Sequence, residues 1–196
     1  MQVELNAIEA KIYQLAMPHL AVRENDIHVA NALEFAFKLL ETESWDRDIV
    51  IPAVILHDVG WSRVSQDIIR DTVVRYVHTG DKSLTRIHEE EGVKIAASIL
   101  QEVGYGSEQT AKILQIIGGH DSRKTALSIN DKIVKDADAL TRYAKSFPMY
   151  AGLLGVTHRR HCEILESYGD SWFFLSASKI MAREELEQRK RESAAE

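Results

Sequence analysis

The feature that most constrains this chain is an apolar run from Ile49 to Leu56 that leads directly into His57 and Asp58. Such a run belongs in a protein core, and ionisable side chains are rarely fully buried there unless they are paired or bind a metal. A His-Asp dipeptide also arises by chance in a large minority of chains of this length. The pair is therefore a candidate metal site only if the fold brings it further ligands from other core-facing positions.

The pattern of the whole chain predicts an all-α fold. Apolar residues recur with helical spacing over long segments, strand-like alternation is scarce, and only three prolines interrupt the 196 residues. This length is sufficient for one domain with a sizeable core, and we find no repeat, low-complexity segment or linker that would divide it.

The periodic segments predict helices at about 3–17, 24–41, 46–58, 66–77 and 83–103, from 107 to the glycines at 118 and 119, and at about 128–144, 157–168 and 171–190, with a small helical region near 148–155. The first helix should end near Met17, because the residue before a proline avoids the helical region. Pro52 predicts a kink or a late start in the third helix.

Composition excludes several classes of function. Net charge is −6 and no dense basic stripe is visible, so a polymeric nucleic acid is not an expected partner. No apolar run approaches the length of a membrane span, and the first residues lack the pattern of a signal peptide. Cys162 is the only cysteine, which excludes an intramolecular disulfide and fits a reducing cytoplasm.

Four histidines occupy positions that we expect to face the core. His28 shares a helical face with apolar residues four, seven and eleven positions later, and His88 shares one with Gly92 and two isoleucines. Gly92 removes bulk beside His88, which leaves room for a cofactor or a neighbouring helix. His120 follows a helix whose isoleucines form an inward face, and His57 ends the apolar run.

A single histidine on an apolar stripe is more often a hydrogen-bonded core residue than a ligand. Four of them together with a His-Asp pair favour metal binding instead. The other histidines lie in polar or turn-like settings, and we expect them at the surface: His19, His78, His158 and His161. On the helix that carries His88, we expect the side chains of Glu89, Glu90 and Lys94 to face water.

The candidate ligands sort into two sets that share one carboxylate. Imidazole suits iron, manganese, zinc and nickel, and a carboxylate can bridge two ions. We expect one ion to use His28, His57, Asp58 and a late aspartate, and a second to use His88 and His120 with Asp58 as the bridge. Asp58, His88 and His120 are then the candidate catalytic residues. The sequence is compatible with iron, manganese, zinc, nickel or magnesium, and with one or two ions per chain.

The late aspartate has two candidates within the segment Lys-Asp-Ala-Asp. Asp136 shares its helical face with Ile129, Ile133 and Leu140, so periodicity alone would bury Asp136. Asp138 lies two residues later on another part of the helix surface. Periodicity therefore favours Asp136 and leaves Asp138 open.

The pattern His28…His57-Asp58…Asp138 resembles the HD-domain superfamily of metal-dependent phosphohydrolases, together with the segments Ala-Val-Ile-Leu-His-Asp-Val-Gly and Val-Lys-Asp-Ala-Asp-Ala-Leu. The resemblance covers residues 20–145 and implies a single domain over residues 1–196. That domain would be a helical bundle with a central metal site, against which helices of residues 146–190 pack. The resemblance assigns the ligand role to Asp138 and leaves Asp136 to orient a ligating histidine.

The resemblance extends to a subgroup with two metals, whose additional histidines His88 and His120 match. The subgroup that cleaves cyclic dinucleotides departs from this chain, since it has two adjacent histidines where this chain has His120 and Asp121, and the chain lacks a Gly-Tyr-Pro signature. The resemblance therefore argues against that specific activity.

The implied function is a cytoplasmic phosphohydrolase, a phosphomonoesterase or phosphodiesterase, in which metal-activated hydroxide attacks a small phosphorylated metabolite or nucleotide. Basic residues that could contact the phosphate are Lys82, Arg86, Lys135 and Arg142. One alternative is a di-iron oxygenase, because a branch of the superfamily holds two irons with the same four histidines and two aspartates. Another is a metal- or ligand-binding domain without turnover. The sequence is compatible with a homodimer.

Overall fold

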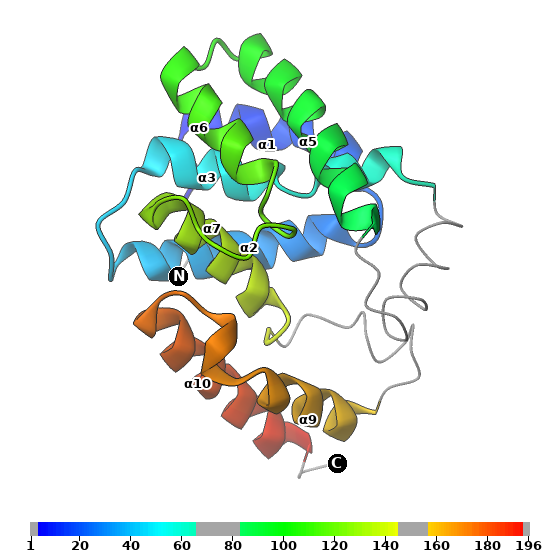
Figure 1. Ribbon diagram of the computed structural model, residues 1–196, viewed down its shortest axis with the longest axis vertical. Coiled ribbons are helices and arrows are strands. Elements are labelled where there is room, and N and C mark those ends of the chain that lie inside the picture. The colour runs from blue at the N-terminus through cyan, green and yellow to red at the C-terminus, as the bar shows by residue number, and fades with distance from the viewer. Residues whose placement is uncertain (1–3, 66–82, 145–156, 194–196) are drawn as a thin grey trace.

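A computed structural model describes residues 4–65, 83–144 and 157–193 (Figure 1). These residues form helices joined by turns and contain no strand, which confirms the all-α prediction. The elements are α1 (Ala7–Leu20), α2 (Asn25–Leu40), α3 (Arg47–Leu56), η1 (Val59–Arg63), α5 (Ser83–Glu102), α6 (Ser107–Ile117), α7 (Ile129–Thr141), α9 (His158–Tyr168), η2 (Gly169–Trp172) and α10 (Ser176–Ser193). The helical segments predicted at 66–77 and 148–155 lie outside the described residues.

Helix α3 forms the centre of the bundle. Every residue from Ile49 to Leu56 is buried, as expected for a continuous apolar run. The helix contacts α1, α2, α6 and α7, while α5 packs on η1 and α6. In Figure 1, α5 and α6 lie at one end of the molecule, α9 and α10 at the other, and α2, α3 and α7 between them. The chain that leaves α3 at His57 therefore enters the middle of the protein.

Helix α1 does not end at Met17 but continues through Pro18 to Leu20, so that boundary was wrong. Ile12, Ala16 and Leu20 follow one another at intervals of four residues, and all three are fully buried. This stripe continues across the proline, and burial of Leu20 offsets the one backbone hydrogen bond that Pro18 cannot donate. The restriction on the residue before a proline is a preference that packing can override.

The crossing of η1 and α5 brings His88 beside the His57-Asp58 pair. A Cβ atom added to Gly60 would lie 1.9 Å from the carbonyl oxygen of His88 and 2.5 Å from the backbone nitrogen of Gly92. Only glycine allows such an approach of two backbones. The space predicted beside Gly92 is thus filled by a neighbouring element, η1.

Among the described helices, none has the length and hydropathy that crossing a bilayer requires.

Candidate metal centre

Three elements supply a first group of ligand atoms. His28 comes from α2, His57 and Asp58 follow α3, and Asp138 comes from α7. The Nε2 atoms of His28 and His57 are 3.0 Å apart, and Oδ1 of Asp138 lies 3.2 Å from the former and 3.9 Å from the latter. Oδ2 of Asp58 lies 3.5 Å and 3.7 Å from the same two nitrogens. The structure therefore brings together all four residues of the first predicted set.

A second group lies on the other side of Asp58. The Nε2 atoms of His88, from α5, and His120, which follows α6, are 3.2 Å apart. Oδ1 of Asp58 lies 3.7 Å from the first and 3.5 Å from the second. The two oxygens of one carboxylate thus face two different histidine pairs, which is the arrangement of a carboxylate that bridges two ions.

Backbone contacts fix the orientation of one imidazole in each pair. Nδ1 of His57 lies 2.7 Å from the carbonyl oxygen of Val54, and Nδ1 of His120 lies 2.8 Å from that of Ile117. A carbonyl only accepts, so each Nδ1 carries a proton, which leaves Nε2 as the ring nitrogen that can bind a metal ion. Converging nitrogen lone pairs and carboxylate oxygens, nearly all buried, form a donor set that suits divalent transition metals.

Without a metal, protons have to balance the buried carboxylates. Burial opposes the charge of Asp58, but the surrounding histidines, led by His57, hold its pKa well below the usual range. Burial and the neighbouring His120 lower the pKa of His88 to about 4. Burial also disfavours the charged form of His120, yet its contact with Asp58 and the charge of Asp121 raise its pKa to about 9. The cluster thus holds positive charge on one imidazole of the second pair, where a metal ion would supply it instead.

Trp61, which was not predicted as a site residue, contacts two residues of the second group. Nε1 of Trp61 donates to Oδ1 of Asp58 over 3.1 Å, and the indole stacks on His88 with ring centres 4.1 Å apart and planes within 10°. The guanidinium carbon of Arg23 lies 3.9 Å from the centre of the Trp61 ring. Two groups stacked this closely on one ring take opposite faces, so Trp61 lies between Arg23 and His88. The position of Trp61 three residues after Asp58 was the available signal, because such residues lie side by side in a helical turn.

Asp136 does not orient a histidine, and that prediction was wrong. Its Oδ1 accepts the backbone N–H of Phe174 over 3.0 Å, and its Oδ2 accepts that of Leu175 over 2.9 Å. The residue is fully buried, as periodicity predicted, but it faces the start of α10 instead of the metal centre. Burial raises the pKa of Asp136, although these N–H groups act in the opposite direction.

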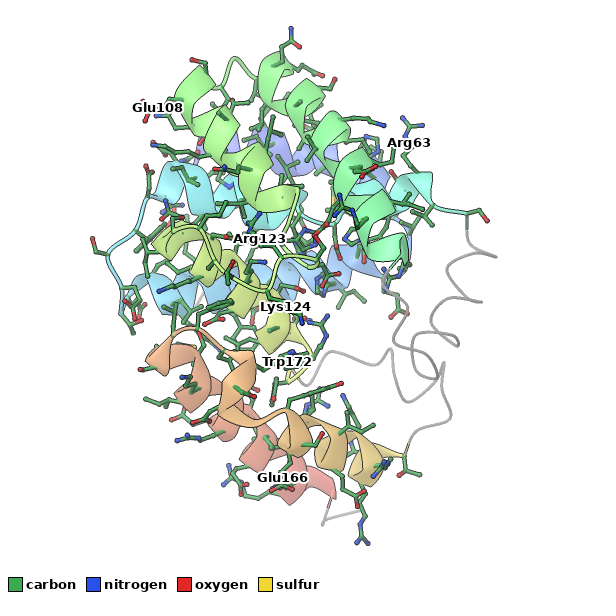
Figure 2. The ribbon with its side chains drawn as sticks, in the orientation of Figure 1. Arg63, Glu108, Arg123, Lys124, Glu166 and Trp172 are labelled. Carbon is green, nitrogen blue, oxygen red and sulfur yellow. The ribbon has the colours of Figure 1, made fainter. Side chains whose placement is uncertain are left out.

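The four basic residues predicted to contact the phosphate lie in different surroundings. Nη1 of Arg142 lies 3.7 Å from Oδ1 of Asp138, and its guanidinium lies 5.2 Å from the ring centre of Trp172, which Figure 2 shows between α7 and the C-terminal helices. Arg86 is exposed on α5, where its Nη2 lies 3.9 Å from Oε1 of Glu90. Lys82 lies outside the described residues. Lys135 was misassigned, because its buried ammonium group donates to backbone carbonyls.

Two residues expected at the surface are buried. Glu89 is 2% exposed and accepts backbone N–H groups from the segment after His120. His161 is 7% exposed and contacts the guanidinium of Arg189. Both contacts join segments far apart in the sequence, which helical periodicity does not detect.

Comparison with known proteins agrees with this geometry. A family model described as the HD domain matches residues 25–143. A crystal structure of a predicted HD superfamily hydrolase from an uncultured Thermotogales bacterium superposes with a TM-score of 0.60, covering 95% of this chain and 91% of that chain at 19% identity. That likeness shows a shared fold. No curated protein matches the chain. Since the family model spans more than half of the sequence and includes every residue of the metal centre, the protein belongs to the HD domain family.

Proposed function

We propose that this protein is a metal-dependent hydrolase of phosphate esters, acting on a small phosphorylated metabolite or nucleotide. The observation that carries the proposal is the position of Asp58, whose two oxygens face separate histidine pairs. The structural relative described as a predicted HD superfamily hydrolase supports hydrolysis, and the resemblance to HD-domain phosphohydrolases supports a phosphate ester.

The residues divide into two ligand sets in this proposal. His28, His57, Asp58 and Asp138 would hold one ion, and His88, His120 and Asp58 would hold the other. Two ions that share a carboxylate supply Lewis acidity towards a phosphoryl group and lower the pKa of water. The chain contributes fixed ligands, since backbone carbonyls hold the rings of His57 and His120, and the indole of Trp61 holds Asp58.

Arg142 is the candidate for binding the phosphate. Its side chain is 25% exposed and its Nη1 lies near Asp138, so a cation stands at the edge of the first ligand set. A guanidinium can donate two parallel hydrogen bonds to an anionic oxygen pair. Arg86, directed to solvent beside Glu90, is the weaker candidate, and Lys82 stays a prediction from the sequence.

A di-iron oxygenase is the second candidate, favoured by the complete set of four histidines and two aspartates. The same donors suit both chemistries, so ligand geometry does not separate them. Oxygen consumption by the iron-loaded protein would distinguish an oxygenase from a hydrolase. A domain that binds a metal or ligand without turnover would show neither activity.

The decisive experiment is a panel of phosphomonoesters and phosphodiesters incubated with protein reconstituted separately with manganese, iron, zinc, nickel or magnesium. We expect metal-dependent phosphate or alcohol release from at least one ester class, abolished in Asp58→Asn, which keeps the shape of the side chain and removes its charge. Substrate-dependent oxygen uptake with iron, without ester cleavage under any metal, would replace the hydrolase with the oxygenase.

A further inference from the structure

The turn that carries His120 is held by a buried cation from one side. We refer to residues 119–123, which follow α6, as the His120 turn. Nζ of Lys135 donates to the carbonyl oxygens of Gly119 and His120, each over 2.6 Å, and to that of Arg123 over 2.9 Å. An ammonium group has three protons, so these contacts use all of its donors. Figure 2 shows Arg123 between α6 and α7, where the turn lies.

An anion holds the same turn through its N–H groups. Oε1 of Glu89 accepts the backbone N–H of Asp121 over 2.9 Å and that of Ser122 over 2.8 Å. Burial opposes ionisation of Glu89, whereas a hydrogen bond from the Ser122 side chain and these two backbone hydrogen bonds lower its pKa. The turn therefore has its carbonyls bound by a cation and its amides bound by an anion.

The two charged residues belong to helices that also carry metal-centre residues. Lys135 lies three positions before Asp138 on α7, and Glu89 directly follows His88 on α5. Each is less than a tenth exposed. The His120 turn is thus connected at once to a helix of the first ligand set and to a helix of the second.

Helix capping explains only part of this arrangement. A lysine near the end of α6 would satisfy carbonyls and complement the helix dipole wherever it occurred. Capping does not account for Glu89, which binds amide groups beyond the helix end. Hydrogen bonds to both the carbonyl and the N–H groups of this short turn instead fix the backbone from which the His120 ring projects. His120 is the ligand residue that lies outside a helix and shares no turn with Asp58.

We propose that Lys135 and Glu89 are positioning residues that set the affinity of the second metal site by fixing the backbone of His120. The inference rests on the proposed function only in requiring that His88 and His120 bind an ion. Neither residue belongs to the two groups of candidate ligands. Loss of such supporting contacts typically weakens metal binding about 10- to 100-fold.

A calorimetric titration of the metal-free protein with Mn²⁺ tests the role of Glu89 through a matched pair of variants. Glu89→Gln keeps an oxygen that accepts both N–H groups, whereas Glu89→Leu has similar size and no acceptor. We expect two ions to bind wild type and Glu89→Gln, and the second ion to bind Glu89→Leu about 10- to 100-fold more weakly, with the first unchanged. Equal second-site affinity in all three proteins would overturn the proposal, as would equal weakening of both sites in Glu89→Leu.

Lys135→Met tests the other contact, with Lys132→Met as a control that removes a cation from the preceding turn of the same helix, α7. We expect selective weakening of the second ion in Lys135→Met alone. Weakening of equal size in both variants would reduce the effect to net charge and overturn the inference.

If wild type bound a single ion, the second site itself would be disproved, whereas failure to hydrolyse esters with two ions bound would disprove only the proposed reaction.

Discussion

Asp138 and Asp136 lie two residues apart on α7 and serve different purposes. Oδ1 of Asp138 lies 3.2 Å from Nε2 of His28, within the first ligand set, whereas Asp136 binds two backbone N–H groups at the start of α10. We predict that Asp138→Asn loses the first ion, because it removes a charged ligand. Asp136→Asn should keep both ions. Metal content after equilibrium dialysis measures the difference.

Asp136→Asn should instead affect stability. An asparagine can offer its oxygen to one N–H group, but its NH₂ group then faces the other, leaving a buried donor unsatisfied. Such a loss costs about 1–3 kcal/mol of unfolding free energy. If Asp136→Asn lost metal while Asp138→Asn kept it, helical periodicity would have been the better guide to the ligand.

The hydrogen bond from Trp61 to Asp58 gives a second prediction about a single residue. Trp61→Phe keeps an aromatic ring between Arg23 and His88 but removes the N–H that donates to Oδ1 of Asp58. Since that oxygen faces His88 and His120, we expect the affinity of the second ion to fall about 10-fold or more and the first to change less. Titration with Mn²⁺ measures both affinities. A uniform loss at both sites would show that the hydrogen bond orients the whole carboxylate.

The sequence predicted which residues meet at the centre better than it predicted what holds them. His28, His57, His88 and His120 end or interrupt apolar stripes, and periodicity detects such positions. The partners of Lys135, Glu89 and Asp136 are backbone groups, which have no signature in the sequence. Choosing Asp138 over Asp136 required the family pattern, because both residues lie within one buried segment of α7.

At the scale of elements, helix boundaries followed the apolar pattern where caps agreed with it. Helix α2 begins and ends within one residue of the predicted 24–41, and α7 begins one residue after the predicted start at 128, with Ser128 as its N-cap. The start predicted for the last helix, residue 171, was too early. The chain first forms η2, the backbone N–H groups of Phe174 and Leu175 then donate to Asp136, and α10 begins only after them. That connection spans more than thirty residues, and local preferences cannot reveal it.

The junction of α9, α10 and the end of α7 yields a pH prediction. Nη1 of Arg189 lies 3.2 Å from Nδ1 of His161, and Nε of Arg189 donates to the carbonyl of Tyr143 over 2.6 Å. A guanidinium only donates, so Nδ1 of His161 has to accept and the ring is neutral. Burial, the charge of Arg189 and the neighbouring His158 lower the pKa of His161 to about 4.

Protonation of His161 at low pH favours the unfolded chain over the folded chain. An unfolded chain protonates this histidine near pH 6.5, whereas the folded chain resists protonation until about pH 4. The stability that His161 contributes is therefore complete above about pH 6.5 and is lost as the pH falls towards 4. In His161→Asn, whose oxygen can accept from Arg189 without titrating, we expect this loss to be smaller by about 2 kcal/mol. Urea unfolding of the metal-free proteins at several pH values tests this, and parallel curves would contradict it.

For the whole molecule, the metal centre joins helices that are distant in the sequence. Its ligands come from α2, α5, α7 and the segments after α3 and α6, so they converge only when the bundle is assembled. The unfolded chain has no comparable site. Metal binding should therefore stabilise the folded state by mass action.

The expected size of this stabilisation is measurable. At a free metal concentration of about 100 times the dissociation constant, a single site contributes about 2.7 kcal/mol. In a chain of this size, about 2–4 °C of melting temperature corresponds to each kcal/mol, so we expect the melting temperature to rise by about 5–10 °C. Differential scanning calorimetry with increasing Mn²⁺ should show a continued rise with the logarithm of its concentration, reversed by a chelator. Asp58→Asn should show little of this rise, because it removes the carboxylate shared by both ligand sets. A melting temperature that did not depend on manganese, iron, zinc or nickel would mean that the six residues do not form a metal site in the folded protein.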